Sequence, residues 1–312
     1  MKRVDENRTL PEEIMLDPIK HIIVPTDFSE VSDIAERSAV ALAARDGAAI
    51  HLLHVIRLPF FHTTYDLNVP EAIWEGLRRD ADQQMEEARL KLEKYGAADV
   101  RELVSESLQP AEAIAQSARD LAADFVVMAT HGHQGLKHAM IGSVTERTAR
   151  TCPIPVLSVK GYGIAEAPIQ RILFATDFSS NARHALSVAS DFAERFGTQL
   201  DILHVLDETP EYIRQISTEV ADFEKQARRM ASEHLDAVEK ELRNRSFSVE
   251  THLRSGSPVE VIIAEAARLR AKLIVMGTHG HTGFAHAALG SIAERTLRLA
   301  SCSVLTVRDH GD

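Results

Sequence analysis

The chain carries one series of segments twice, in the same order. The segment at residues 21–29 returns at 171–179, and the offset between the two copies changes by only two residues along the chain. Each copy has the size of a domain, which excludes a solenoid of short repeats and indicates a tandem duplication. The matching pairs are HIIVPTDFS and RILFATDFS, IHLLHVI and LDILHVL, DFVVMATHGH and KLIVMGTHGH, IGSVTERTAR and LGSIAERTLR, and PVLSVK and SVLTVR.

The duplication predicts how the chain divides. Its 312 residues suit two domains of ordinary size. The segment between the two copies contains Gly and Pro and is typical of a linker. The predicted division is a polar N-terminal extension at 1–17, a first domain at 18–160, a linker at 161–169 and a second domain at 170–310.

The composition argues against several classes of protein. A formal net charge of −11 argues against sequence-independent binding of nucleic acid, which needs a basic surface. No apolar run is long enough to span a bilayer, and the N-terminus lacks the apolar stretch of a secretory signal. Cys152 and Cys302 are the only cysteines, so we expect buried small side chains rather than a disulfide framework. We therefore predict a cytoplasmic protein without nucleic-acid or membrane partners.

Each half alternates short apolar runs with amphipathic helical patterns, which predicts an α/β fold with a parallel sheet. Ser29 or Ser32 can cap the first helix, and Gly47 suits its end. Pro110 suits the first turn of a later helix. In the first half we expect strands at 21–26, 50–56, 100–105, 125–129 and 156–159, and helices from the serines to 47, at about 71–95, at 110–122 and from 143 onward.

Two loops carry polar residues where a ligand is expected. Ligands of open parallel sheets bind beyond the carboxyl ends of the strands. Asp27 and Asp177 follow the first strand of each half, and the segment THGH follows the fourth strand of each half. Each aspartate could accept a hydrogen bond from an exocyclic amine or a ribose hydroxyl, or bind a metal. The alternative is that each aspartate only favours the start of the following helix.

The glycine-rich loop of the second half offers an anion site. Gly277 would allow close approach of a ligand, and Gly280 can take a positive φ. Gly290 and Ser291 open a helix whose backbone N–H groups and serine hydroxyl point at one place. The pattern lacks the lysine of a Walker loop, so phosphate would depend on amides and hydroxyls. The alternative is an ordinary turn followed by a serine cap.

The segment GTHGHTGFAHAALGS matches the G-x2-G-x9-G-[ST] nucleotide motif of the universal stress protein family. The segments IIVPTDFS, LLHV and PVLSV also resemble that family, in its order and in both halves. The resemblance implies two tandem open sheets of five parallel strands, order 3-2-1-4-5, with helices on both faces, as in the adenine nucleotide alpha hydrolase-like fold. It also implies ATP or a related nucleotide in some members, with Mg²⁺ carried by the phosphates.

The resemblance further implies which residues bind. Phosphates and ribose would contact the glycine-rich loop, and adenine would contact Asp177 and the backbone of Leu200. No catalytic residue and no metal-binding residue is assigned. The second-half binding set is Asp177, Leu200, Gly277, Thr278, Gly280, His281, Gly290 and Ser291, and the first-half equivalents are Asp27, Ile50, Gly132, Gly142 and Ser143.

The first half departs from the motif. Ala129 replaces its leading glycine, and Leu108 stands where the second half has Gly256, so we expect a narrower first cleft. Most copies of the motif in this family have an arginine where this chain has His133 and His281. Ala175 replaces the proline of the second TD segment. We therefore predict that the second domain binds the nucleotide and that the first is weakened or repurposed.

Three alternative interpretations remain open. The histidines of the two glycine-rich loops could bind zinc, although their spacing in a loop fixes no geometry. At most slow ATP hydrolysis is expected, since nothing resembles a catalytic triad or a carboxylate pair. The aromatic segment 57–74 could cover a ligand but is better explained by packing between the domains. His54 and His204, inside apolar strands, are interpreted as core residues.

The fifth strand of each half is the expected sheet edge, and exposed edges favour pairing. In the family that strand pairs two domains back to back. We expect PVLSVK and SVLTVR to pair within this chain, and a homodimer is a further hypothesis.

Overall fold

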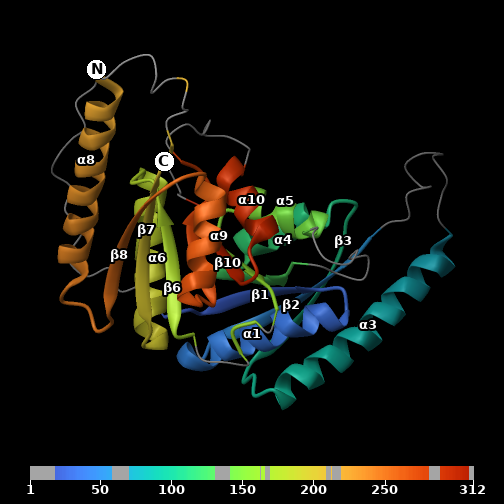
Figure 1. The fold of residues 1–312 in the computed structure, drawn as a ribbon. Helices are drawn as coiled ribbons and strands as arrows, with labels where there is room; N and C mark the ends of the chain where they lie inside the picture. The colour runs from blue at the N-terminus through green and yellow to red at the C-terminus, as the bar shows by residue number, and fades with distance from the viewer. Residues whose placement is uncertain are drawn as a thin grey trace.

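A computed structural model describes residues 18–57, 70–130, 141–161, 163–165, 169–208, 212, 219–280 and 289–308. These residues form one ten-stranded sheet in the order β3-β2-β1-β4-β5-β10-β9-β6-β7-β8 (Figure 1). The strands are β1 (His21–Thr26), β2 (Ala49–Ile56), β3 (Val100–Glu106), β4 (Phe125–Ala129), β5 (Val156–Val159), β6 (Arg171–Thr176), β7 (Gln199–Leu206), β8 (Val249–Ser255), β9 (Leu273–Gly277) and β10 (Ser303–Val307). The helices are α1 (Glu30–Asp46), α3 (Glu71–Lys94), α4 (Pro110–Asp120), α5 (Ser143–Thr151), α6 (Ser180–Phe196), α8 (Glu219–Leu242), α9 (Pro258–Leu269) and α10 (Ser291–Leu299).

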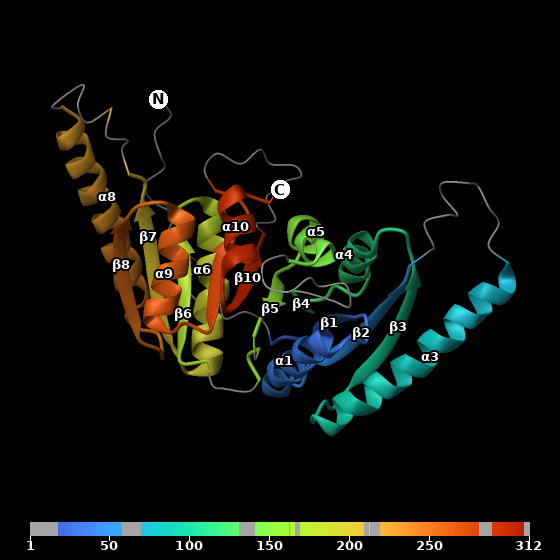
Figure 2. The same cartoon turned by 45° about the vertical axis from the view of Figure 1, so that its right-hand side comes forward.

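Each half of the sheet has the predicted architecture. Its five strands are parallel and follow the repeat order 3-2-1-4-5, so the expected fold is confirmed. The central strands are apolar on both faces because helices cover both faces. Helices α1, α3, α6 and α8 pack on one face, and α4, α5, α9 and α10 pack on the other (Figure 2).

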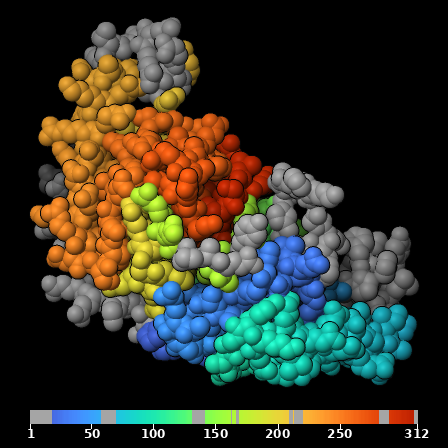
Figure 3. Space-filling view, turned by 60° about the horizontal axis from the view of Figure 1, so that its bottom comes forward, coloured from blue at the N-terminus to red at the C-terminus, as the bar shows by residue number. Residues whose placement is uncertain are grey.

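The two halves join at the centre of the sheet, through antiparallel pairing of β5 with β10. Leu157 pairs with Leu305 at the middle of this contact, so the expected pairing within the chain is confirmed. On the face covered by α6, the rings of Phe125 and Phe192 meet edge to face at 5.5 Å between centroids. One buried cluster contains side chains of both halves, and Figure 3 shows the first half, in blue, directly against the second, in yellow. The halves therefore share a core.

The local signals for α1 and α6 act as expected. Ser29 and Ser179 are the N-caps, each accepting a hydrogen bond from an amide three residues later. The structure thus selects Ser29 over Ser32. Gly47 ends α1 in the left-handed conformation, with φ of 71°. No helix in the described part of the chain is long and apolar enough to cross a membrane.

An aromatic residue with positive φ precedes each N-cap. Phe178 has φ of 63°, a conformation that costs energy in residues other than Gly. Its ring packs on His204 with 4.4 Å between centroids, and Phe28 packs on His54 at the same distance. In each half, a ring contact with a histidine of the neighbouring strand thus accompanies the positive φ beside the aspartate.

Candidate functional site

The loops after β6 and β9 meet at the carboxyl edge of the second half-sheet. A Cβ built on Gly280 would lie 2.4 Å from Oδ2 of Asp177, so the carboxylate rests directly over this glycine. The two loops therefore meet at this edge, as neighbouring parallel strands predict, and we call the place where they meet the crevice. The expected positive φ at Gly280 is wrong, because the described glycines with positive φ do not include it. A side chain at Gly280 would displace the Asp177 carboxylate from its present position.

The two aspartates make different hydrogen bonds. Oδ1 of Asp177 accepts a hydrogen bond from the Ser179 amide at 3.0 Å. Oδ1 of Asp27 accepts one from the Ser29 amide at 3.2 Å and a second from the Ser32 hydroxyl at 2.5 Å. The repeat places Ala182 where the first half has Ser32, so this hydroxyl donor is specific to the first half.

The amino end of α10 is the second part of the crevice. Gly290 is its N-cap and provides no side chain to satisfy the first amides. Those amides have no partner within the helix and carry the positive end of its dipole, which suits an anion. Ser291, the first residue of α10, is exposed beside them. The first half repeats this start at Gly142 and Ser143.

Two predicted donors are used within the protein. The Gly290 amide donates to the carbonyl of Thr278 at 2.7 Å, so this N–H is not available to a phosphate, contrary to expectation. The Gly142 amide makes the same bond to Thr130 at 2.6 Å. The Thr278 side chain is buried and contacts Nδ1 of His279 at 2.9 Å. The bond from Gly290 fixes the start of α10 against the end of β9.

The leading glycine of the motif faces a helix. A Cβ on Gly277 would lie 3.4 Å from the Asn181 backbone, an ordinary contact distance. Ala129, at the matching position, is buried. The expected match of Leu108 with Gly256 is wrong, because the amides of Ser107 and Gly256 donate to the equivalent carbonyls of Ile56 and Leu206. Leu108 itself is 45% exposed. These replacements therefore give no geometric reason for a narrower first crevice. Gly256 is needed for its own conformation, since it has φ of 141° and a Cβ there would lie 2.9 Å from Val261.

The assignment of Leu200 and Ile50 is wrong. Leu200 pairs with Ile172 near the beginning of both strands, at the edge of the sheet opposite Asp177. The distance along the strand from there to Asp177 is about 17 Å at about 3.3 Å per residue. Ile50 pairs with Ile22 in the same way.

Thr176 pairs with His204, so Asp177 and Val205 hold the next matching positions at the ends of their strands. Val205 was not among the expected site residues. Val55 holds this position in the first half. The signal was available, because parallel neighbours place their ends at the same edge of a sheet.

Part of the predicted site lies outside the described residues. Gly132 and His281 belong to this part, as do most histidines of the two loops and residues 58–69 of the aromatic segment. His54 and His204 are described and half-buried, with Nδ1 contacting the carbonyls of Thr26 at 3.0 Å and Thr176 at 2.8 Å. Burial lowers the pKa of His204. Both side chains are satisfied within the protein, as predicted.

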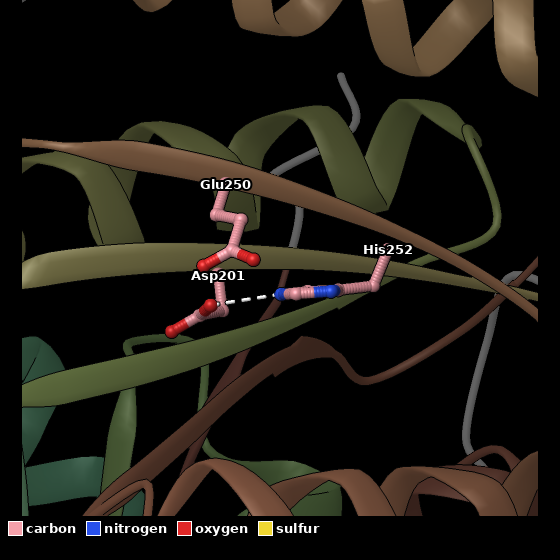
Figure 4. Close-up of side chains that lie close together, drawn as sticks. All are labelled: Asp201, Glu250 and His252. Atoms are coloured by element: carbon pink, nitrogen blue, oxygen red, sulfur yellow. Dashed lines mark hydrogen bonds and ion pairs between the residues drawn. The ribbon is translucent and has the colours of Figure 1, made fainter.

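A cluster of Asp201, Glu250 and His252 has the composition of a metal site (Figure 4). It lies toward the amino ends of β7 and β8, far from the crevice. The Arg171 guanidinium donates to Asp201 twice, at 2.9 Å from both Nε and Nη2, and to Glu250 at 2.7 Å. Nε2 of His252 contacts Asp201 at 2.8 Å. The arginine therefore supplies the positive charge that a metal would bring.

The first half has histidines at the matching strand positions. His21 replaces Arg171, and His51 replaces Asp201. Nδ1 of His21 lies 3.1 Å from Nε2 of His51, which is 2% exposed. Burial lowers the pKa of His51, which favours its neutral form. The same place in the fold holds an ion pair in one half and an imidazole pair in the other.

Known proteins match the chain over both halves. The model of the Universal stress protein family matches residues 18–160 and 168–308. Universal stress protein E of Photorhabdus laumondii is 26% identical, over 94% of this chain and 96% of its own. A universal stress protein of Mycolicibacterium smegmatis is 28% identical, over 92% and 96%.

A solved structure has the same fold. The universal stress protein from Archaeoglobus fulgidus superposes with a TM-score of 0.67 at 23% identity, covering 92% of this chain and 96% of that one. The family model accounts for both halves described above, including the two loops that form the crevice. This chain belongs to the universal stress protein family.

Proposed function

We propose that this protein is a cytoplasmic stress-response regulator that binds an adenine nucleotide, ATP with Mg²⁺, mainly in the crevice of its second half. The observation that carries the proposal is the position of Asp177 over Gly280, beside the amino end of α10. This arrangement combines a hydrogen-bond acceptor with an anion site in one crevice. An adenine nucleotide has the complementary groups, an amine at one end and phosphates at the other.

Each part of the nucleotide has a partner. Asp177 and the backbone at Val205 would accept and donate hydrogen bonds at the base or the ribose. The amides of the first turn of α10 and the Ser291 hydroxyl would bind phosphate oxygens. The motif contains no lysine at the phosphates. Mg²⁺ would therefore supply charge neutralisation there.

Differences between the halves support binding mainly in the second. Asp27 accepts a hydrogen bond from the Ser32 hydroxyl, and the second half has Ala182 at the position of Ser32. The Thr145 hydroxyl donates at 2.7 Å to the carbonyl of Ala129 at the end of β4. The second half has Ala293 at the position of Thr145. The first half thus has two hydroxyl donors, Ser32 and Thr145, that the second half lacks at the matching positions.

The test is calorimetric titration with Mg·ATP of wild type, Asp177→Asn and the matched control Asp27→Asn. Asparagine keeps the oxygen that accepts from the Ser179 amide, but it places an amide donor where Asp177 has its second acceptor. We expect Asp177→Asn to lower affinity roughly 10- to 100-fold, the value of a hydrogen bond to a charged group. Asp27→Asn should change affinity less than about twofold by comparison. The opposite ranking would assign the nucleotide to the first half.

Three further variants sharpen the test. Ala182→Ser supplies the second half with the extra hydroxyl, and we expect it to weaken binding by about tenfold or less. Gly290→Asp places a negative charge at the start of α10, and Gly142→Asp does so at α5. We expect only Gly290→Asp to abolish binding. Loss of binding from Gly142→Asp alone would reverse the assignment of the two halves.

Bound ATP is expected to be hydrolysed slowly at most. Phosphate release from saturating Mg·ATP should stay far below the 1 to 1,000 per second that is roughly typical of enzymes. A rate in that range, lost in Asp177→Asn, would show instead that the protein is an ATPase.

A further inference from the structure

A lysine of the first half binds the carboxyl end of α10, the helix whose amino end is the proposed phosphate site. Lys160 directly follows β5, and its Nζ donates to the carbonyls of Leu297 at 2.8 Å, Arg298 at 2.9 Å and Ala300 at 2.8 Å. These carbonyls terminate α10, whose first residue is Ser291. The helix that would bind phosphate at one end is therefore bound at its other end by the neighbouring domain.

The reciprocal contact is also present. Arg308 follows β10, and its Nη1 donates at 3.1 Å to the carbonyl of Arg150, near the end of α5. The antiparallel pairing of β5 with β10 relates the two contacts, because it carries each strand end across to the other half. Glu146 of α5 and Arg298 of α10 form an additional ion pair at 3.7 Å. Helices α5 and α10 thus contact each other, and each is also bound by a residue of the other half.

We propose that Lys160 is a positioning residue for the nucleotide site of the second half, and that Arg308 does the same for α5. The inference rests on the proposed function, because it takes the amino end of α10 as the phosphate site. It goes beyond that function in making each crevice depend on a residue of the other domain. Binding in one half is then coupled to the packing between the halves.

Helix geometry gives the physical reason. The last carbonyls of a helix have no partner within it and carry the negative end of its dipole, so an ammonium group there is stabilising. α10 is short, about 13 Å at about 1.5 Å per residue. A displacement at Ala300 therefore reaches Ser291, where the bond from Gly290 to Thr278 holds the start of the helix against β9.

The environment of Lys160 shows that the contact is not a loose surface interaction. Its side chain is half-buried, and burial lowers its pKa to about 8. The Lys160 ammonium is therefore still charged in most molecules at pH 7. The nearby Cys302 thiol has its pKa raised to about 11 by burial and is neutral there. The three carbonyls of α10 are the polar partners that compensate the ammonium for lost water.

The experiment compares wild type, Lys160→Met, Lys160→Arg and Arg308→Met as full-length chains at pH 7. Methionine keeps an unbranched apolar side chain and removes the donors, while arginine restores a charged donor. Hydrogen exchange of the α10 and α5 amides reports the helices directly, and titration with Mg·ATP reports the site. Circular dichroism checks folding, and Lys160→Gln replaces the methionine variant if that one fails to fold.

We expect Lys160→Met to speed exchange in α10 but not in α5, and to weaken Mg·ATP binding about three- to tenfold, the range of a charge at a helix end. Lys160→Arg should restore most of the affinity. Arg308→Met should speed exchange in α5 and leave binding in the second half within about twofold. Wild-type exchange and affinity in Lys160→Met would overturn the inference. If wild type does not bind Mg·ATP, the proposed function fails, and exchange in α10 alone decides whether Lys160 positions that helix.

Discussion

Replacing Arg171 by methionine isolates a buried carboxylate, which gives a sharp test of the polar network in the second half. Asp201 is 0% exposed. It accepts two hydrogen bonds from Arg171 at 2.9 Å, one from Gln199 at 3.3 Å, and contacts His252 at 2.8 Å. The substitution removes two of these four contacts, together with the permanent positive charge.

The expected cost follows from these contacts. Removing one partner of a buried ion pair costs about 3–5 kcal/mol, because the remaining charge stays in a medium of low dielectric. We expect a value near the lower limit, about 3 kcal/mol, since Gln199 and His252 still contact Asp201. The double variant Arg171→Met, Asp201→Leu removes both charges. Its free energy of unfolding should lie within about 1 kcal/mol of that of wild type, because transferring two ions from water into the protein is itself unfavourable.

The assay is equilibrium unfolding in urea, followed by circular dichroism for the whole chain and by fluorescence of Trp74 for the first half. Trp74 is the only tryptophan, so its signal is specific to that half. A double variant no more stable than Arg171→Met, or a loss below about 1 kcal/mol in Arg171→Met, would refute the charge argument.

Three further predictions test other features. Arg171→Met leaves three potential ligands within 4.8 Å of one another, so Zn²⁺ should raise the melting temperature of that variant but not of wild type. Burial lowers the pKa of His51, so the unfolded chain takes up a proton there before the folded chain does. The folded state therefore loses stability as the pH falls below about 6.5. Between about pH 7 and 5, thermal melts of His51→Gln should show a smaller loss of stability than those of wild type. Asp33 pairs with Lys91 at 2.5 Å. Lys91→Glu should lower the free energy of unfolding by about 0.5–1 kcal/mol, and adding Asp33→Arg should recover that loss in a double-mutant cycle. An equal loss in the single and the double variant would contradict the pairing.

That last pair is also visible in the duplication. The second half has Arg183 where the first has Asp33, and Glu241 where the first has Lys91. Arg183 lowers the pKa of Glu241, although burial raises it more, so the reversed charges interact in the second half too. The exchange of charge between the two copies is therefore a signal, present in the amino-acid sequence, that these two positions are in contact.

The resemblance to a known family predicted the pairing of β5 with β10. The sequence patterns by themselves determined the repeated α/β fold, the bounds of the central strands and the end of α1 at Gly47. These features depend on burial patterns and backbone preferences within a few residues, and the duplication shows each pattern twice. The sequence also indicated which loops form the crevice, because parallel strands place their ends together.

Only the tertiary structure decided which atoms meet. Strand register places Leu200 at the edge of the sheet opposite Asp177 and Val205 at the same edge as Asp177, and the Gly290 amide is used by the Thr278 carbonyl. Arg171 and Asp201 come from different strands, and Lys160 reaches carbonyls about 140 residues away. No local pattern marks such contacts, because burial and pairing between distant segments are fixed only when the sheet and its helices assemble.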